Sequence, residues 1–163
     1  QYGLDVRVGF IDEVELPAAS FDLITIWHVL EHTADPYAVL RQLRAALRPG
    51  GRLVVEVPNI EATCQSPRSS FHEAHLYTFG EPTLGRLGAR AGLAAVSSTL
   101  SEDGGNITMI FEPVAASAAA PVPEAAALRI PGNHARVEKI VAGHTFWSHA
   151  LSLHPWRRAA ERM

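Results

Sequence analysis

Side chains that can transfer a proton gather in two short stretches of this sequence. His28, Glu31 and His32 follow directly on an apolar segment, and His75 and Tyr77 lie in a later stretch. An imidazole gains and loses a proton near neutral pH, which makes histidine a common acid or base in catalysis. The residue types therefore allow acid–base chemistry in either stretch.

The first stretch, His28-Val29-Leu30-Glu31-His32, also matches H-x-x-E-H, a spacing used by one group of zinc peptidases. That chemistry needs both histidines on one face of a helix, the glutamate beside them and a third ligand elsewhere. Here His28 ends a predicted β-strand, and Asp35-Pro36 starts the next helix only afterwards. Zinc hydrolysis is therefore a minor alternative, and we expect no metal site in the chain.

The segments that position the first stretch form a predicted strand–helix–strand unit. Residues 5–8 alternate as in a short strand, and 21–27 is a nearly continuous apolar run that suits a strand covered on both faces. Asp35-Pro36 can cap a helix whose apolar stripe continues to Leu47, and a strand follows at 52–57. Short connections predict a right-handed parallel crossover.

The second stretch lies in a predicted loop from Ile60 to about Phe79. Loops of this length are usually functional or mobile. A helix is expected over 81–91, followed by strands at 95–100 and 107–111 around a glycine-rich turn typical of a hairpin.

The last fifty residues differ in composition from the rest. Residues 114–131 are rich in alanine and proline and are interpreted as a linker, and 132–163 as a helical tail broken at His154-Pro155. The expected division of the chain is therefore 1–113, 114–131 and 132–163.

The overall composition excludes several classes of function. The 163 residues are 47% hydrophobic and 19% charged, with a formal net charge of −3. Without a basic stripe, a nucleic-acid partner is not expected. No apolar run approaches the roughly 18 residues of a membrane span, and the single cysteine, Cys64, cannot form an internal disulfide. We expect a cytoplasmic protein that does not contact a membrane.

The order of the segments is shared with a known family. The text FDLITIWHVLEHTADPYAVLRQLRAALRPGGRLVVEVPN, followed by HLYTF, EPTLGRLGARAGL and the final strand pair, resembles class I S-adenosylmethionine-dependent methyltransferases over about residues 3–112. The resemblance implies an α/β, Rossmann-like sheet of order 3-2-1-4-5-7-6 with strand 7 antiparallel. Strands 3 to 7 would be residues 4–8, 21–27, 52–57, 94–100 and 106–112.

Strands 1 and 2 of that sheet have no counterpart in this amino-acid sequence. In the family they carry a glycine-rich loop near the methionine part of the cofactor and an acid that binds the ribose. Segment 21–27 would then be a sheet edge with unpaired backbone groups. Segment 4–8 could move to pair with it, another chain could do so, or residues could precede Gln1; we favour the last.

The resemblance also implies the cofactor-binding residues. Phe10, Ile11 and Asp12 follow strand 3, where family members place an apolar side chain and an acid around adenine. Glu13 is an alternative for the acid, and a solvated loop is an alternative for the whole segment. Trp27 ends strand 4, beside the methionine portion of S-adenosylmethionine.

Two catalytic candidates follow from the same resemblance. His28 also ends strand 4, where it would contact the cofactor and could orient the substrate or remove its proton. His75 lies in the segment that covers the acceptor in the family and is the second candidate. A structural role is the alternative for each.

The sequence thus predicts methyl transfer from S-adenosylmethionine to an unidentified small molecule. This activity is expected to need residues upstream of Gln1. The alternative is a non-catalytic remnant or assembly module of the same fold, because the glycine-rich loop is missing. A homo-oligomer could form through the tail or through the exposed strand edge. The acceptor and the atom methylated are not identified by the sequence.

Overall fold

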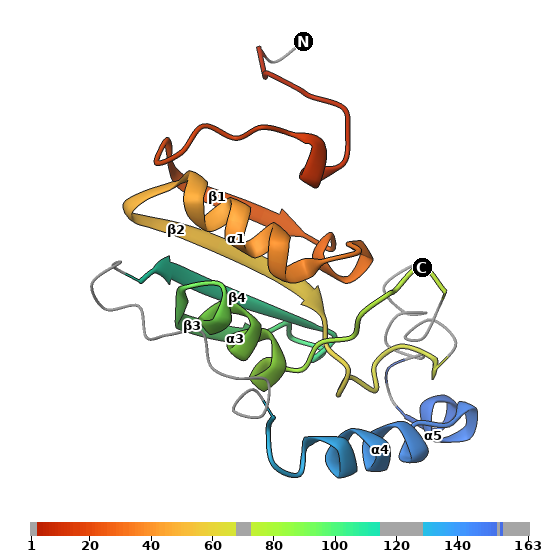
Figure 1. The fold of residues 1–163 in the computed structure, drawn as a ribbon. Helices are drawn as coiled ribbons and strands as arrows, with labels where there is room; N and C mark the ends of the chain where they lie inside the picture. The colour runs from red at the N-terminus through yellow and green to blue at the C-terminus, as the bar shows by residue number, and fades with distance from the viewer. Residues whose placement is uncertain (1–2, 68–72, 115–128, 153, 155–163) are drawn as a thin grey trace.

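The computed structural model describes residues 3–67, 73–114, 129–152 and 154. These residues form a mixed α/β structure around one four-stranded sheet (Figure 1). Its elements in chain order are the 3-10 helix η1 (Ile11–Glu13), β1 (Phe21–Trp27), the 3-10 helix η2 (Leu30–His32), α1 (Pro36–Ala46), β2 (Leu47–Pro58), α3 (Glu81–Arg90), β3 (Leu93–Leu100), β4 (Asn106–Pro113), α4 (Asn133–Gly143) and α5 (Phe146–Ala150).

The sheet has the strand order β1-β2-β4-β3. Strands β1 and β2 are parallel, whereas β4 is antiparallel to both β2 and β3. In the numbering of the predicted sheet this order is 4-5-7-6. The crossover, the α3 helix and the terminal hairpin are therefore confirmed.

The β1–α1–β2 crossover follows local signals in the sequence. The carboxylate of Asp35 accepts a hydrogen bond from the backbone N–H of Ala38 at 2.9 Å, which caps α1. Leu40 is fully buried against the sheet. Leu47, expected on the same helical stripe, instead begins β2. The helix ends early because Pro49 disfavours helical backbone in the residue before it.

One face of the sheet carries the hydrophobic core. Helices α1 and α3 cover this face, as Figure 1 shows. In α3, a Cβ atom on Gly88 would lie 2.2 Å from Cε1 of Phe111, which is far inside van der Waals contact. Glycine therefore sets how closely α3 approaches β4. The core side chains from β2 and β4 are Leu47, Leu53, Val55, Val57, Ile107, Met109 and Phe111.

In the described part of the chain the other face of β1 is open, contrary to the prediction that this strand is covered on both faces. Ile26 is buried, but Leu23 is 58% exposed and Thr25 is exposed too. Among the residues described, the helices packed on the core lie on the opposite face. The apolar pattern of β1 indicated two covered faces, yet the described structure supplies a cover for only one.

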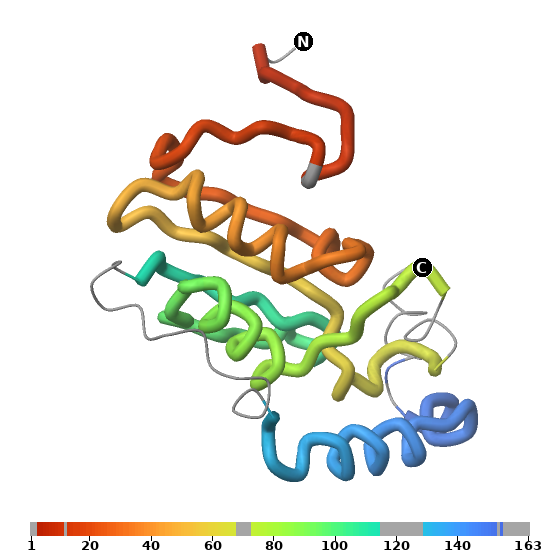
Figure 2. Tube along the Cα trace, viewed as in Figure 1, coloured from red at the N-terminus to blue at the C-terminus, as the bar shows by residue number. Residues whose placement is uncertain are grey.

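The expected strand at residues 4–8 does not form. Leu4 and Val6 are each 76% exposed and Val8 is 99% exposed. The segment stands apart from the sheet in Figure 2. A strand needs a neighbour to satisfy its backbone groups. In the described part of the chain, this segment pairs with no strand and the outer edge of β1 is likewise unpaired.

The long loop after β2 is closed at its base. Asn59 and Phe79 form an isolated parallel bridge, and the backbone N–H of Ile60 donates to the carbonyl oxygen of Phe79 at 2.8 Å. The two ends of the loop therefore meet beside the carboxyl end of β2.

Helices α4 and α5 confirm a helical tail as far as Ala150. Residues 115–128 of the expected linker, and Pro155 of the expected break, lie outside the described part of the chain. The division into 1–113, 114–131 and 132–163 stays a prediction. No helix among the described residues is long and apolar enough to cross a bilayer.

The tail contacts the first residues of the long loop. Nη1 of Arg136 in α4 lies 2.6 Å from Oε1 of Glu61, and Nδ1 of His149 in α5 lies 3.2 Å from the carbonyl oxygen of Thr63. The tail is thus tied to the same end of the sheet as the loop.

Candidate functional site

The carboxyl ends of the parallel strands β1 and β2 form the candidate site. His28 directly follows β1, and its backbone N–H donates to the carbonyl oxygen of Glu56 in β2 at 3.0 Å. Its φ angle of 53° is in the left-handed region, which side chains other than glycine adopt infrequently. Backbone strain of this kind is concentrated at functional positions. The turn aims the His28 ring across the end of the sheet.

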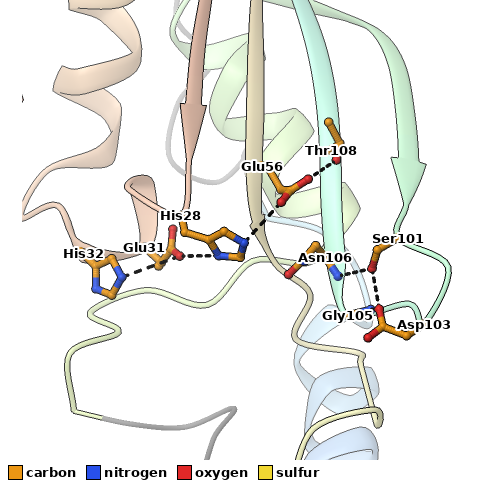
Figure 3. Close-up of polar contacts among 9 residues, drawn as sticks. All are labelled: His28, Glu31, His32, Glu56, Ser101, Asp103, Gly105, Asn106 and Thr108. Atoms are coloured by element: carbon orange, nitrogen blue, oxygen red, sulfur yellow. Dashed lines mark hydrogen bonds and ion pairs between the residues drawn. The ribbon is translucent and has the colours of Figure 1, made fainter. Parts of the chain in front are cut away.

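The ring of His28 lies between two carboxylates (Figure 3). Its Nδ1 is 3.3 Å from Oε1 of Glu31, and its Nε2 is 3.3 Å from Oε1 of Glu56. The hydroxyl of Thr108 in β4 donates to Oε2 of Glu56 at 2.7 Å. Glu31 is almost fully buried, whereas His28 is partly open to solvent. A polar chain across three strands therefore fixes the plane of one accessible imidazole.

The later stretch of the sequence folds onto the first one. Nδ1 of His32 lies 2.7 Å from the carbonyl oxygen of Ala74, and the backbone N–H of Tyr77 donates to the carbonyl oxygen of Glu31 at 3.1 Å. The rings of His32 and His75 meet edge to face with centroids 4.9 Å apart. The loop thus brings His75 to the end of β1.

A cavity of about 290 Å³ lies between these two segments. Its walls include His28, Glu31, His32, His75 and Tyr77, together with Asn59. A cavity of this size suits a small organic molecule. The structure therefore brings the two catalytic candidates of the sequence to one cavity, and their catalytic role stays a prediction.

Of the predicted cofactor residues, His28 lines this cavity, whereas Phe10, Ile11, Asp12 and Trp27 are not among its described lining residues. Phe10 and Trp27 are 75% and 51% exposed, and Ile11 is half-buried against the core. Asp12 is part of η1, and its side chain is outside the described structure. Exposed Trp27 and Phe10 offer apolar surface that a bound cofactor could cover, but this sequence holds no glycine-rich loop to complete that site.

The zinc-peptidase geometry is not formed. His28 lies after β1 with a left-handed backbone, while Glu31 and His32 belong to the single-turn helix η2. The two histidines of the H-x-x-E-H spacing therefore do not share a helical face.

Sequence reasoning missed two members of the polar chain, Glu56 and Thr108. Glu56 interrupts the apolar run of β2, and this charged residue in a strand is the signal that could have identified it. Thr108 carries no such signal, because its role depends on the antiparallel pairing Glu56↔Thr108.

The β3–β4 turn forms part of the site. Its Gly105 lines the cavity, and the carbonyl oxygen of Gly105 accepts a hydrogen bond from the backbone N–H of Asn59 at 2.9 Å. The backbone N–H of Gly105 donates to Oδ1 of Asp103 at 2.9 Å, and the hydroxyl of Ser101 donates to the same oxygen at 2.8 Å. These bonds lower the pKa of Asp103, that from Gly105 most.

The variant Asp103→Asn should lose less stability in acid than the natural chain. A carboxyl whose folded pKa is lowered contributes fully above its ordinary value of 3.8, and this contribution disappears as the pH falls through the lower folded value. Urea unfolding between about pH 6 and pH 2.5 measures the difference. Equal losses of unfolding free energy in the two proteins would contradict the role of Asp103.

Comparison with known sequences gives a consistent set of relatives. A family described as "Methyltransferase domain" matches residues 3–98. The "Ubiquinone biosynthesis O-methyltransferase" of Xanthomonas axonopodis pv. citri is 37% identical over 57 residues, which are 34% of this chain and 24% of that protein. A probable S-adenosylmethionine-dependent methyltransferase of Mycolicibacterium smegmatis is 33% identical over 76 residues, or 45% and 30% of the two chains. The matches therefore span less than a third of these relatives.

Comparison with solved structures gives the same fold. The S-adenosylmethionine-dependent methyltransferase of Thermotoga maritima, a possible histamine N-methyltransferase, has a TM-score of 0.56 and 19% identity, covering 68% of this chain and 64% of that one. A second such enzyme, from Aquifex aeolicus, also has a TM-score of 0.56, with 15% identity and coverage of 69% and 56%.

Proposed function

Since this chain belongs to the class I S-adenosylmethionine-dependent methyltransferases, we propose that it takes part in methyl transfer from S-adenosylmethionine to a small-molecule acceptor. The observation that carries the proposal is the ring of His28, held between Glu31 and Glu56 beside a cavity of about 290 Å³. Ligands of open α/β sheets bind at this end of the strands.

His28 would hold the acceptor and take its proton. When bound, S-adenosylmethionine supplies an electrophilic methyl group. The acceptor would replace the Glu56 contact at Nε2 and give its proton to that nitrogen, while Glu31 stays beside Nδ1 and Thr108 fixes the orientation of Glu56. His75, on the opposite loop, would close the acceptor cavity.

The cofactor would lie on the outer side of β1. In the proposal, Trp27 and His28 contact its methionine part, while Phe10, Ile11 and Asp12 surround adenine. The sequence holds no G-x-G stretch that could replace the family's glycine-rich loop. We assign that part of the grip to a segment outside these 163 residues, consistent with the small share of the relatives that the chain matches.

We also propose partners for this chain other than the acceptor. The unpaired outer edge of β1 and the tail helices are the two surfaces proposed for a second copy of the chain. The net charge of −3 favours an uncharged or cationic small acceptor over a nucleic acid.

Calorimetry with S-adenosylhomocysteine tests the proposal. The titration compares the 163-residue chain with the longest chain that the reading frame encodes. We expect micromolar binding by the longest chain and weaker binding by the 163 residues. A panel of phenols, catechols and amines, with S-adenosylhomocysteine formation as the readout, would then identify the acceptor. If the longest chain did not bind, the non-catalytic module would be the better description.

A further inference from the structure

Three of the side chains that line the cavity meet as metal ligands do. One ligand atom from each of Glu31, His32 and His75 lies within 4.8 Å of the other two. The first two residues belong to the turn after β1, and the third comes from the long loop 43 residues later. The three side chains are therefore brought together by the fold, because His75 is distant from the other two in the sequence.

Glu31 provides the buried charge of this cluster. Its side chain is 1% exposed, and neither carboxylate oxygen accepts a hydrogen bond from the described residues. Its closest ion-pair contact is Nδ1 of His28 at 3.3 Å from Oε1. Burial of a carboxylate is costly unless a cation or several donors compensate it. Oε2 is therefore a buried acceptor that a cation in the cluster would satisfy.

His32 is oriented as a metal-bound histidine is. A carbonyl oxygen only accepts hydrogen bonds, so the 2.7 Å contact with Ala74 requires Nδ1 of His32 to carry the hydrogen. In the neutral ring this leaves the lone pair on Nε2, which lies 3.8 Å from Oε1 of Glu31. Histidines that bind metals commonly donate their other N–H to a backbone carbonyl in this way.

The loop that carries His75 is fixed to the same turn. The backbone N–H of Tyr77 donates to the carbonyl oxygen of Glu31 at 3.1 Å, and the hydroxyl of Tyr77 donates to the carbonyl oxygen of Ala34 at 3.2 Å. These two bonds hold the His75 ring against His32, with centroids 4.9 Å apart.

From this geometry we propose that Glu31, His32 and His75 bind a divalent transition-metal ion of the Zn²⁺ type. Two imidazoles and one carboxylate are a donor set that suits zinc and its neighbours better than magnesium or calcium. Ligand atoms around a tetrahedral zinc lie roughly 3.4 Å apart, so the three atoms, now within 4.8 Å of one another, must move closer by up to about 1.4 Å on binding. All three residues line the cavity, which leaves the fourth coordination position to a ligand there.

The donor set Glu31, His32 and His75 differs from the zinc-peptidase pattern. That pattern pairs His28 with His32 and uses the glutamate as a base. In the proposed site, His75 from the distant loop takes the place of the first histidine, and Glu31 is a ligand. In this stretch His28 was weighed with His32 from the sequence, and only the fold brings His75 to them.

Zinc titration of untagged, chelator-treated protein tests the site. A chromophoric zinc chelator serves as competitor, and mass spectrometry of the metal gives the stoichiometry. We expect one zinc per chain, and a loss of affinity of about 100-fold or more in His75→Asn and in Glu31→Gln. Zinc should also raise the Tm of the natural chain and not that of His75→Asn.

Two matched variants separate this site from other histidines. His134→Asn removes an exposed histidine of α4. His149→Asn removes one ring of the His144–His149 contact, whose centroids are 6.2 Å apart. Both should keep the zinc affinity. The proposal is overturned if the natural chain binds no zinc in the micromolar range, or if His149→Asn abolishes binding while His75→Asn preserves it. The zinc titration needs no S-adenosylmethionine. Its result therefore tests the metal site whether or not the chain takes part in methyl transfer.

Discussion

Replacing Gly88 with alanine should lower the free energy of unfolding by about 1–3 kcal/mol, in spite of the better helix propensity of alanine. The new Cβ atom would lie 2.2 Å from Cε1 and 2.8 Å from Cζ of Phe111. Phe111 is fully buried in β4, so its ring cannot move aside without displacing the core. Urea unfolding followed by circular dichroism measures the loss.

Gly85, one turn earlier in α3, is the matched control. Its Cβ would meet only Sδ and Cε of Met109, both at 3.9 Å, which is ordinary contact. Gly85→Ala should therefore be neutral or stabilise the protein by up to about 1 kcal/mol. In the double variant Gly88→Ala/Phe111→Leu, the loss of unfolding free energy should be smaller than the sum of the two single losses. Leucine is smaller than phenylalanine and leaves room for the new Cβ atom. If the two alanine variants unfold at the same urea concentration, the close approach of α3 to β4 is incorrect.

Replacing His28 with asparagine should reduce methyl transfer by roughly 100-fold or more, the size expected when a general base is lost. Asparagine tolerates the left-handed backbone of this position, where φ is 53°, so the turn after β1 should survive. The rate would be measured as S-adenosylhomocysteine formation by the longest chain of the reading frame, with the best acceptor of the panel.

His134→Asn is the control for the chemistry of this substitution, because its side chain is 88% exposed on α4. It should keep the full rate. Glu56→Gln should give an intermediate rate, since it removes one of the two charges at the His28 ring but keeps the Thr108 contact. A natural rate in His28→Asn with unchanged binding of S-adenosylhomocysteine would exclude this histidine as the base.

The sequence predicted those parts of the fold that local signals determine. Asp35-Pro36 starts α1, and glycine-rich turns separate α3, β3 and β4, so these elements were found. The segment at 4–8 has an equally good strand pattern, but a strand depends on a partner that no local signal reveals. For the same reason, the apolar run of β1 did not disclose that only one of its faces is covered.

His28 and His75 are candidates because their segments resemble those of the family, and the structure places both side chains beside one cavity. Their catalytic role stays a prediction. Glu56 and Thr108 were not predicted, because their meeting depends on the register between β2 and β4. Glu31 and His32 were weighed as part of a helical motif, whereas their partner His75 lies across a loop.

The loop between Asn59 and Phe79 is closed at its base, and this has an evolutionary consequence. Because a bridge and a backbone hydrogen bond already join its ends, residues added between them extend a closed loop and leave the sheet untouched. The entropy of loop closure grows slowly, by about 0.6 kcal/mol for each doubling of length. Insertions in this loop can therefore reshape the wall that carries His75 while the strands that hold His28 stay fixed. Acceptor preference is free to diverge among related proteins at little expense in stability.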